Sequence, residues 1–414
     1  MNERRIVVVG GGPAGMMAAI RAGELRQDVT LIEKNPVLGK KLLLSGKGRC
    51  NLTNACDLDS FIKRFWGNGQ FLRDAFNKFF NLDLIRFLEQ RGLKLKTERQ
   101  LRVFPQTNRS DSIAEVLKKE LYKNKVKIIY RAQLKDIVIQ DNRVKSSILS
   151  DGRFLAADRI ILATGGISYG FTGSTGEGLE IAKKLGHTIT PLRQGLVPLE
   201  TRQKFPKLLE GLTLKNIRLK FSDGEKEIIS ETGELLFTDF GISGPLVLTL
   251  SGQIVDWVNE GKDVYVEIDL KPALTKEQLN ARFLREFKLN SKKTIKNALK
   301  NILPQRLIAI FLEIAKINSD KKVSFITLAE RQNLILLLKS FWLDILRPMP
   351  IEQAMLTRGG ISLREINPRT MESRLIKGLY FAGEMIDVDA DTGGFNLQAA
   401  FSTGYLAGER TALN

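Results

Sequence analysis

The sequence has very few residues of the kinds that carry enzyme chemistry without a cofactor. Its 414 residues include two cysteines, Cys50 and Cys56, and one histidine, His187. These numbers exclude a zinc site built from Cys and His ligands and argue against a disulfide scaffold, so we expect no metal site. A Ser-His-Asp site is excluded unless His187 is its base, and its position after Gly186 favours a structural or surface role. If the chain is an enzyme, its reactive group comes largely from a bound molecule.

The sequence is also not expected to contain an export signal or a membrane-spanning segment. Residues 6–22 are rich in small and apolar side chains, but Gly10, Gly11, Gly12 and Pro13 interrupt them. This pattern is typical of a strand, a turn and a helix, and not of a signal peptide or a membrane span. We therefore expect a cytoplasmic protein with no membrane partner. With 43% hydrophobic and 27% charged residues, the chain is long enough for two or three globular domains.

The sequence has fewer acidic than basic residues. Lys and Arg number 64 against 46 Asp and Glu, which gives a net charge of +18. Residues 271–340 hold 15 basic and five acidic residues, a local excess of ten positive charges. Such a segment is either a solvated, lysine-rich helical surface or a surface that binds nucleic acid or anionic lipid. The lack of an aromatic-interleaved RNA motif favours the solvated surface, and an RNA partner stays open as the alternative.

What the chain does contain, at its start, is a dinucleotide-binding pattern. Residues 6–9 are an apolar run typical of a buried parallel strand, and the segment Gly10 to Gly15 that follows has the spacing G-x-G-x-x-G. Residues 16–25 predict a helix, and residues 28–33 predict a second strand. The glycines allow a tight turn, a close approach of pyrophosphate to the backbone, and close packing of helix on strand. The helix N-terminus attracts the phosphates.

Glu33 ends this second strand, 18 residues after Gly15. A carboxylate at this place accepts hydrogen bonds from the ribose hydroxyls of the adenosine. An acidic group there disfavours a 2′-phosphate, so the site suits FAD or NAD rather than NADP. The order of strand, glycines, helix, second strand and acid makes the pattern specific.

Two later segments favour FAD. Residues 158–166, which follow a strand pair turning at residues 151–152, form an apolar strand ending in Ala-Thr-Gly-Gly. Residues 378–384 form another strand ending in Gly-Glu, and residues 393–398 open a helix over 399–413. This arrangement of segments resembles that of the two-dinucleotide-binding-domain flavoproteins. The resemblance implies that Gly383-Glu384 contacts the ribityl-pyrophosphate region. It also implies that the last helix points its N-terminus at the N1/C2 edge of the flavin, where it would stabilise the charge of the reduced ring.

The loop over residues 39–54 is the most distinctive stretch. Its glycines let the backbone pass close to a planar ligand, its cations offset phosphate or reduced-flavin charge, and its asparagines hydrogen-bond ring edges. The glycines are Gly46 and Gly48, the cations are Lys41, Lys47 and Arg49, and the asparagines are Asn51 and Asn54.

On these segments the chain resembles the BaiN-like, aminoacetone-oxidase-like family of bacterial NAD(P)/FAD-dependent oxidoreductases. Further matching segments span nearly the whole length: Arg102 to Pro105, Gly173 to Gly178, Phe237 to Leu248, Thr357 to Gly360 and Gly383 to Gly404. Lys40 departs from the pattern, where an Arg is expected. The resemblance implies a Rossmann-type FAD-binding domain interrupted by an insert with a β-barrel-like part and a helical part. It does not identify a substrate.

The motif and the resemblance together predict one set of cofactor-binding residues. They are Gly10, Gly12, Pro13, Ala14, Gly15, Glu33, Lys34, Lys41, Ser45, Gly46, Arg49, Cys50, Asn51, Ala163, Thr164, Gly165, Gly383, Glu384, Gly394, Asn396, Leu397 and Gln398.

The expected fold class is α/β, with residues 1–190 and 351–414 forming the FAD-binding domain and residues 191–350 forming the insert. Alternating polarity predicts strands within residues 191–270, at 212–221, 225–230 and 264–270. Residues 271–346 are expected to be helical: a capping box at Thr275 opens one helix through Phe287, Pro304 opens a second, and residues 334–346 form a third. We expect substrate to meet the flavin near Tyr169, Arg358 and the acids Asp387, Asp389 and Asp391, although a solvated loop explains these acids equally well.

Three functions stay open. The first is a flavin oxidoreductase that moves hydride between flavin and a small organic substrate or NAD(P)H. The insert has no second G-x-G-x-x-G, so NAD(P)H would bind without a second Rossmann half. The second is a thiol-disulfide flavoenzyme using Cys50 and Cys56, which their C-x5-C spacing disfavours. The third is a flavoprotein that binds or acts on RNA through its basic insert. No catalytic acid or base and no oligomeric state is identified.

Overall fold

The computed structural model describes residues 4–413 and divides them into two compact units. Unit 2 comprises Leu196–Pro350, and unit 1 comprises the described residues on both sides of it. Each unit has its own cluster of buried apolar side chains. Unit 1 is therefore built from two separate stretches of the sequence.

A five-stranded parallel sheet forms the centre of unit 1, in the order β20-β10-β1-β2-β6. Its strands are β1 (Arg5–Val9), β2 (Asp28–Glu33), β6 (Lys127–Tyr130), β10 (Arg159–Leu162) and β20 (Leu379–Phe381). The strands are apolar runs because both faces of the sheet are covered. Since all strands run the same way, their carboxyl ends meet at one edge of the sheet. The predicted α/β class, with a Rossmann-type unit, is confirmed.

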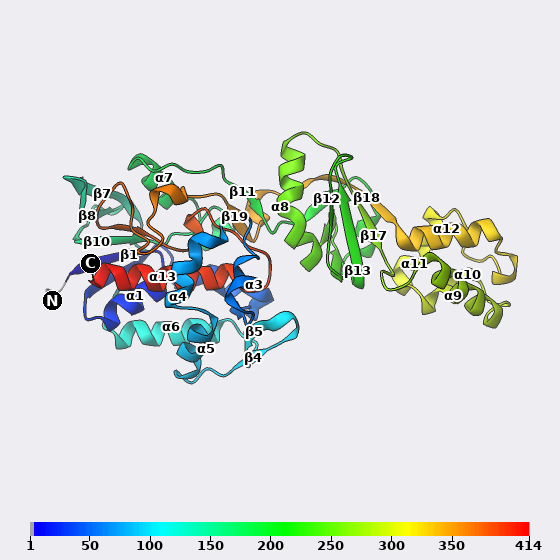
Figure 1. The fold of residues 1–414 in the computed structure, drawn as a ribbon, viewed down its shortest axis with the longest axis horizontal. Coiled ribbons are helices and arrows are strands. Elements are labelled where there is room, and N and C mark those ends of the chain that lie inside the picture. Colours follow the sequence, from blue (N-terminus) through cyan, green and yellow to red (C-terminus); the bar gives the residue numbers. More distant parts are fainter. Residues whose placement is uncertain (1–3, 414) are drawn as a thin grey trace. The chain divides into compact units, whose positions relative to one another are not determined.

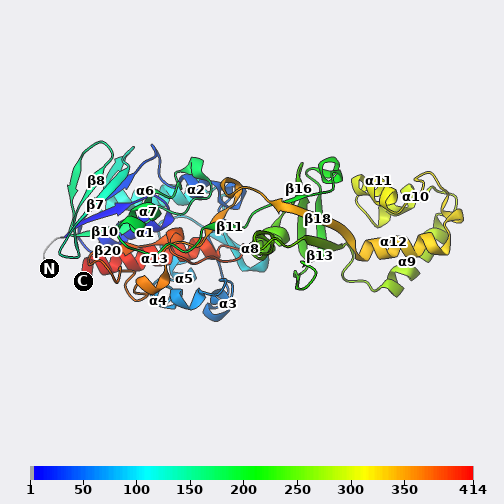
Figure 2. The same ribbon diagram turned by 90° about the horizontal axis from the view of Figure 1, so that it is seen from above.

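Two helices pack closely together beside this sheet, α1 (Pro13–Glu24) and α13 (Phe395–Leu413) (Figures 1 and 2). A β-carbon at Gly404 would lie 2.2 Å from the carbonyl oxygen of Ala14, and one at Gly408 would lie 2.3 Å from that of Ala18. The two helix backbones therefore touch where α13 has glycine. α1 begins three residues earlier than predicted, because Pro13 fits the first turn of a helix.

The other elements of unit 1 surround this centre. One antiparallel sheet joins β7 (Leu134–Gln140), β8 (Arg143–Leu149) and β9 (Phe154–Ala156). A second joins β3 (Thr53–Asn54), β5 (Arg102–Pro105) and β4 (Leu95–Thr97), and β11 (Arg193–Gly195) pairs with β19 (Leu356–Arg358). The remaining helices are α2 (Lys40–Leu44), α3 (Leu58–Ile62), α4 (Arg73–Lys78), α5 (Asn81–Glu89), α6 (Asp111–Lys123) and α7 (Glu177–Lys184).

Unit 2 contains a seven-stranded antiparallel sheet in the order β14-β13-β15-β16-β12-β18-β17. A further pairing of β13 with β17 closes six of these strands into a ring. The strands are β12 (Leu199–Thr201), β13 (Thr213–Ser222), β14 (Glu227–Ile229), β15 (Gly233–Phe237), β16 (Gly241–Ser243), β17 (Val264–Asp269) and β18 (Phe341–Pro348). Helix α8 (Pro245–Asn259), which the sequence patterns did not predict, packs on β15 and β18.

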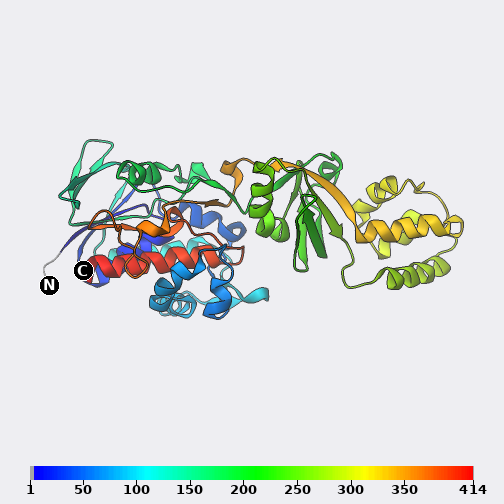
Figure 3. The ribbon, with the colours of Figure 1, turned by 45° about the horizontal axis from the view of Figure 1, so that its top comes forward.

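The helical part of unit 2 comprises α9 (Lys276–Leu289), α10 (Ile295–Ala298), α11 (Gln305–Ile314) and α12 (Leu328–Lys339) (Figure 3). The predicted capping box of Thr275 with Gln278 is present. The predicted helix over residues 334–346 is wrong in its second half. α12 ends at Lys339, and residues 341–348 are strand β18, which pairs with both β12 and β17. Pairing within the ring outweighs the helical pattern there.

Among residues 4–413, no helix combines the length and the apolar character needed to cross a membrane.

Candidate cofactor site

Four of the predicted motifs lie at the same edge of the parallel sheet. Gly10 follows β1, Glu33 ends β2, Ala163 follows β10 and Gly383 lies just beyond β20. Backbone hydrogen bonds continue past the strand ends: Gly10 donates to the carbonyl of Ile32, and Ala163 donates to that of Val9. In open α/β sheets, ligands bind outside the carboxyl ends of the strands. Motifs that are up to about 370 residues apart in sequence are thus brought to one place.

The N-terminus of α1 has the properties of a phosphate site. Gly12 caps the helix without any side-chain hydrogen bond, and the first turn contains no acidic residue. A β-carbon at Gly12 would meet no atom within 4 Å, whereas one at Gly15 would lie 1.9 Å from the carbonyl oxygen of Gly10. Gly15 is therefore needed for packing, and Gly12 borders open space. Free backbone N–H groups and this space fit the pyrophosphate of FAD.

Glu33 is 8% exposed and lies beside this helix N-terminus. Its Oε2 accepts a hydrogen bond from the backbone of Gly11 at 2.7 Å. Its Oε1 accepts from both the backbone and the side-chain amide of Asn35, at 2.7 and 2.8 Å. A carboxylate oxygen accepts about two such bonds, so Oε2 retains capacity for a ribose hydroxyl. The structure also shows what the sequence missed, namely that Asn35 orients Glu33.

The loop over residues 45–54 lies against the start of α13. The side-chain amide of Asn54 donates to the carbonyl of Gly393 at 3.3 Å. A β-carbon at Gly394 would lie 2.5 Å from the carbonyl carbon of Thr53. The amide oxygen of Asn51 is buried and has no hydrogen-bond partner among the described residues. Two predicted segments therefore meet, and the Asn51 oxygen is available to a polar ligand such as the edge of the flavin ring.

Asn396 and Gln398 make contacts within the protein. The Asn396 side chain accepts from the backbone of Ala390 at 2.9 Å and donates to its carbonyl at 2.8 Å. Gln398 is fully buried and donates to Ser402 at 3.0 Å. Leu397 lies beside them in the first turn of α13. The structure thus gives both amides a part in holding the start of α13 in place.

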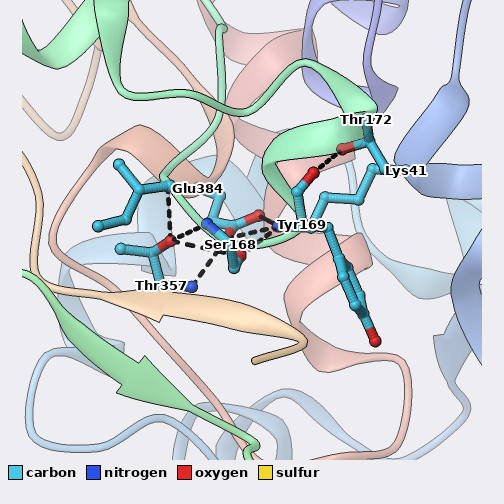
Figure 4. A network of polar contacts seen from close by, with 7 residues as sticks. Lys41, Ser168, Tyr169, Thr172, Thr357 and Glu384 are labelled. Carbon is cyan, nitrogen blue, oxygen red and sulfur yellow. Dashed lines mark hydrogen bonds and ion pairs between the residues drawn. The ribbon is translucent and has the colours of Figure 1, made fainter. Parts of the chain in front are cut away.

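A polar network joins Lys41 and Glu384 (Figure 4). The Lys41 ammonium contacts both carboxylate oxygens of Glu384, at 2.8 and 2.6 Å, and donates to the hydroxyl of Ser168 at 2.7 Å. Glu384 also accepts from the hydroxyl of Ser168 at 3.0 Å and from the backbone of Thr357 at 2.8 Å. The Thr357 hydroxyl accepts from the backbone of Ile167 at 2.8 Å. Four separate segments are tied together here.

Ser168 and Thr357 are two further residues of the candidate site that the sequence patterns did not assign. Both are almost fully buried, at 0% and 1% exposure. Thr357 also limits the size of its neighbour, because a β-carbon at Gly166 would lie 2.3 Å from its hydroxyl oxygen. No spacing rule identifies such a pair, since serine and threonine occur throughout any chain and these two lie 189 residues apart.

The other predicted residues of the site are placed as follows. Lys34 pairs with Glu177 at 3.0 Å, beside the start of α7. Arg49 pairs with Glu98, and its guanidinium lies 4.3 Å from the centre of the Phe104 ring. The hydroxyl of Ser45 donates to the carbonyl of Leu42 at 2.7 Å. Gly46 and Gly165 both have positive φ angles, 57° and 78°. Thr164 lies close to the start of α7, where a β-carbon at Gly178 would lie 2.0 Å from its hydroxyl.

Cys50 and Cys56 are both free thiols. Cys50 is fully buried, and burial raises its pKa to about 12. Burial also raises the pKa of Cys56, and the nearby Asp57 adds to this effect. Thiol exchange requires a thiolate, which neither environment favours at neutral pH. The contacts therefore do not support the thiol-disulfide hypothesis.

Tyr169 follows Ser168 in the network and has an unusual backbone. Its φ is 53°, a left-handed conformation that is costly for a bulky residue. Its ring extends away from the Lys41–Glu384 pair, with the hydroxyl at the distal end (Figure 4). Burial raises the pKa of the phenol. The loop over residues 166–173 thus holds a protonated hydroxyl in a defined direction.

The acids that were expected near the substrate, Asp387, Asp389 and Asp391, are all half-buried. Arg358 pairs with Asp389 at 3.7 Å, and Arg64 pairs with Asp391 at 3.5 Å. Burial raises the pKa of Asp387, which Thr190 and Arg358 partly oppose. This environment differs from that of a freely solvated loop.

The sequence has relatives along its whole length. The family described as "HI0933-like protein Rossmann domain" matches residues 4–410. A "3-dehydro-bile acid delta(4,6)-reductase" of Clostridium scindens is 33% identical over 412 residues, which cover 99% of each chain. A "Ribosomal RNA dihydrouridine synthase" of Haemophilus influenzae is 30% identical over 405 residues, 96% of each chain.

Solved structures share the fold. The chain aligns with 3-ketosteroid delta1-dehydrogenase from Sterolibacterium denitrificans, solved in complex with 1,4-androstadiene-3,17-dione. The alignment covers 100% of both chains with a TM-score of 0.54 and 13% identity.

Proposed function

This chain belongs to the HI0933-like protein Rossmann domain family and is an FAD-dependent oxidoreductase, and we propose that it reduces a carbon–carbon double bond conjugated with a carbonyl group. The observation that carries the proposal is the meeting of four strand ends with the N-terminus of α1, where no side chain accepts a hydrogen bond from the first turn. This arrangement provides for FAD, while neither cysteine is in an environment that favours a thiolate. The reactive group is therefore the flavin.

The names of two full-length relatives point to the bond that is reduced. A delta(4,6)-reductase of 3-dehydro-bile acids acts on double bonds conjugated with a ketone. Dihydrouridine is uridine saturated at a ring double bond conjugated with a carbonyl. The two substrates differ greatly in size and charge, but the reacting group is the same. We infer that this chain shares that chemistry.

The described residues have separate roles in this proposal. The N-terminus of α1 binds the pyrophosphate, and Glu33 binds the ribose. The Lys41–Glu384 pair holds the residues after β20 and the start of α2 against the same ligand. Bound FAD supplies hydride, and NAD(P)H is the proposed electron donor. The remaining requirement is a proton for the carbon next to the carbonyl.

Tyr169 is the proposed proton donor. Saturation of a conjugated double bond adds hydride to the far carbon and a proton to the carbon beside the carbonyl. The phenol of Tyr169 has an ordinary pKa of about 10, which burial raises further. It is therefore protonated at neutral pH, which is the form that donates. The left-handed backbone at this residue orients the ring.

The test uses purified protein containing FAD, without oxygen. NADH or NADPH should bleach the flavin, and an added steroid enone or a uridine-containing RNA should restore its colour with formation of the saturated product. Tyr169→Phe should retain bleaching and slow the second step by about 100-fold or more. The proposal is wrong if reduced flavin persists with every conjugated acceptor and is reoxidised only by oxygen.

RNA is a second candidate substrate class, and one feature of the chain favours it. Residues 271–340 carry an excess of ten positive charges, and the alignment with the Haemophilus relative covers 96% of this chain. Ribosomal RNA from cells lacking the gene, compared by mass spectrometry with RNA from wild-type cells, should then lack one dihydrouridine. Identical dihydrouridine content would remove this candidate and leave the small-molecule reductase standing.

A further inference from the structure

We propose that one surface of unit 2 is a docking site for single-stranded or looped RNA. This surface, here called the α9–α10 tip, comprises Lys288, Leu289, Lys292, Lys293, Lys322 and Phe325. The proposal rests on the RNA candidate above and goes further by naming the residues that bind.

Backbone hydrogen bonds bring the two parts of the tip together. The backbone N–H of Val323 donates to the carbonyl of Lys293 at 3.0 Å, and that of Ser324 donates to Ser291 at 3.3 Å. Thr294 and Lys322 form an isolated antiparallel bridge. The turn after α9 and the segment before α12 are therefore held side by side, although about 30 residues separate them in sequence.

The tip has a concentration of cations that no carboxylate neutralises. Lys288, Lys292, Lys293 and Lys322 are all exposed, and none forms an ion pair with any described residue. Their neighbours differ: Lys296 pairs with Asp320 at 2.7 Å, and Lys321 pairs with Glu330 at 2.6 Å. Four unpaired ammonium groups repel each other, and phosphates of a nucleic acid relieve this repulsion.

Two large apolar side chains stand among these cations. Leu289 is 81% exposed and Phe325 is 66% exposed. A flat aromatic ring in a basic surface is the feature on which unstacked bases pack in single-stranded RNA sites. Double-stranded RNA would not use it, because its bases are already stacked.

An anionic membrane would attract the same lysines, but the tip does not suit it. Binding along a membrane surface needs a helix with a broad apolar face. Leu279 and Phe283 of α9 are fully buried in the core of unit 2, so Leu284 and Leu289 are the only large apolar side chains that this helix exposes. The geometry therefore favours RNA.

The experiment measures binding of the FAD-containing protein to a fluorescein-labelled RNA hairpin with a uridine-rich loop, at several salt concentrations. Replacing Lys288, Lys292, Lys293 and Lys322 by Ala should weaken binding at least tenfold at 0.1 M salt. It should also lower the slope of log Kd against log salt concentration by about three. The matched control replaces Lys63, Lys94, Lys119 and Lys145, four exposed lysines of unit 1, and should change Kd less than threefold.

Phe325 is tested separately. Phe325→Ala should weaken binding by about five- to 100-fold without changing the salt slope, because stacking releases no counterions. Phe325→Trp should bind the hairpin as the wild type does, because tryptophan also offers a flat ring for stacking. FAD content and melting temperature should equal those of the wild type, since the replaced side chains are exposed. If the Lys→Ala protein melts early, the Lys→Gln set replaces it.

Each remaining outcome is decisive. If the wild type binds the hairpin and the tip variants bind equally well, the tip is wrong and RNA remains a candidate substrate. If the wild type does not bind even at low salt, both the tip and the RNA candidate are wrong, while enone reduction is decided by the flavin assay alone. Binding to phosphatidylglycerol vesicles without binding to RNA would assign the tip to membranes instead.

Discussion

Glu384 is the residue on which most of the polar network of the site converges. It accepts hydrogen bonds from Lys41, Ser168 and the backbone of Thr357. Its side chain is 24% exposed and that of Lys41 is 23% exposed, so water screens this ion pair only in part. A partly buried carboxylate that loses its cation keeps the cost of desolvation without the compensating charge.

Lys41→Met should therefore destabilise the protein by about 1–3 kcal/mol, as measured by urea denaturation. Adding Glu384→Gln should recover part of that loss, because the uncompensated charge is then removed. Lys34→Met is the control, since its pair with Glu177 is more exposed, and should cost less than about 1 kcal/mol. Strictly additive effects of the Lys41 and Glu384 changes would contradict the network.

His187 has a buried environment that favours its neutral form. Its Nε2 lies 2.7 Å from the hydroxyl oxygen of Ser373, which already accepts hydrogen bonds from the backbones of Leu375 and Ile376. The Ser373 proton is therefore donated to Nε2, and Nδ1–H donates to the carbonyl of Ala182. Burial lowers the pKa of His187 below its ordinary 6.5, while Ala182 and Glu365 partly oppose this effect.

This lowered pKa makes stability depend on pH with a definite sign. Below about pH 6.5 the unfolded chain binds a proton that the folded chain resists, so the free energy of unfolding decreases as pH falls from 7 towards 5. The contribution is fully present above the unfolded pKa. His187→Gln should remove up to about 1.4 kcal/mol per pH unit of that decrease, as measured by denaturation at each pH. Parallel pH curves for the two proteins would refute it.

At the scale of elements, α1 uses its glycines for different purposes. Gly15 lets the helix approach the turn after β1, whereas Gly12 leaves space in front of the helix N-terminus. Both glycines belong to one motif, yet only one of them is required for folding. Gly404 and Gly408 of α13 resemble Gly15, because each lets the helix pack directly on the backbone of α1.

The two positions should respond differently to one added methyl group. Gly12→Ala should melt as the wild type does, since the φ of Gly12 is −79°, but should bind FAD at least tenfold more weakly, because the methyl group occupies the space of the pyrophosphate. Gly15→Ala should lose about 1–3 kcal/mol of stability from its backbone clash. Fluorescence titration with FAD and thermal melting separate the two effects. Unchanged FAD affinity of Gly12→Ala would place the phosphates elsewhere.

At the scale of the whole molecule, the chain consists of two units with separate cores. The proposed FAD site lies in unit 1, and the proposed RNA tip lies in unit 2. A ligand stabilises only the cooperative unit that binds it. Tryptophans report on both units, because Trp66 belongs to unit 1 while Trp257 and Trp342 belong to unit 2.

Denaturation followed by tryptophan fluorescence should therefore show two transitions. In a Trp257→Phe, Trp342→Phe protein, FAD at 100 times its Kd should stabilise the observed transition by about 2.7 kcal/mol. In a Trp66→Phe protein, the transition should not move with FAD. A single transition that moves equally in both proteins would show that the units unfold together.

Local pattern alone determined the strands on either side of the first cofactor motif and the start of one helix in unit 2. The strand to Val9, the strand to Glu33 and the capping box at Thr275 depend on runs of a few residues, so the sequence was sufficient to predict them. The resemblance to a known family added the interrupted order of the FAD-binding domain. The specificity of the first motif comes from steric limits on glycine positions, which act within one turn.

Only the tertiary structure decided the contacts between distant segments. Residues 341–346 are predicted to be helical, but pairing with β12 and β17 makes them part of strand β18. Thr357 and Ser168 become part of the site because β19 and the loop after β10 meet, and Lys293 meets Val323 through a backbone bond. Such contacts arise from hydrogen bonding and burial across the fold, which no spacing within one segment records.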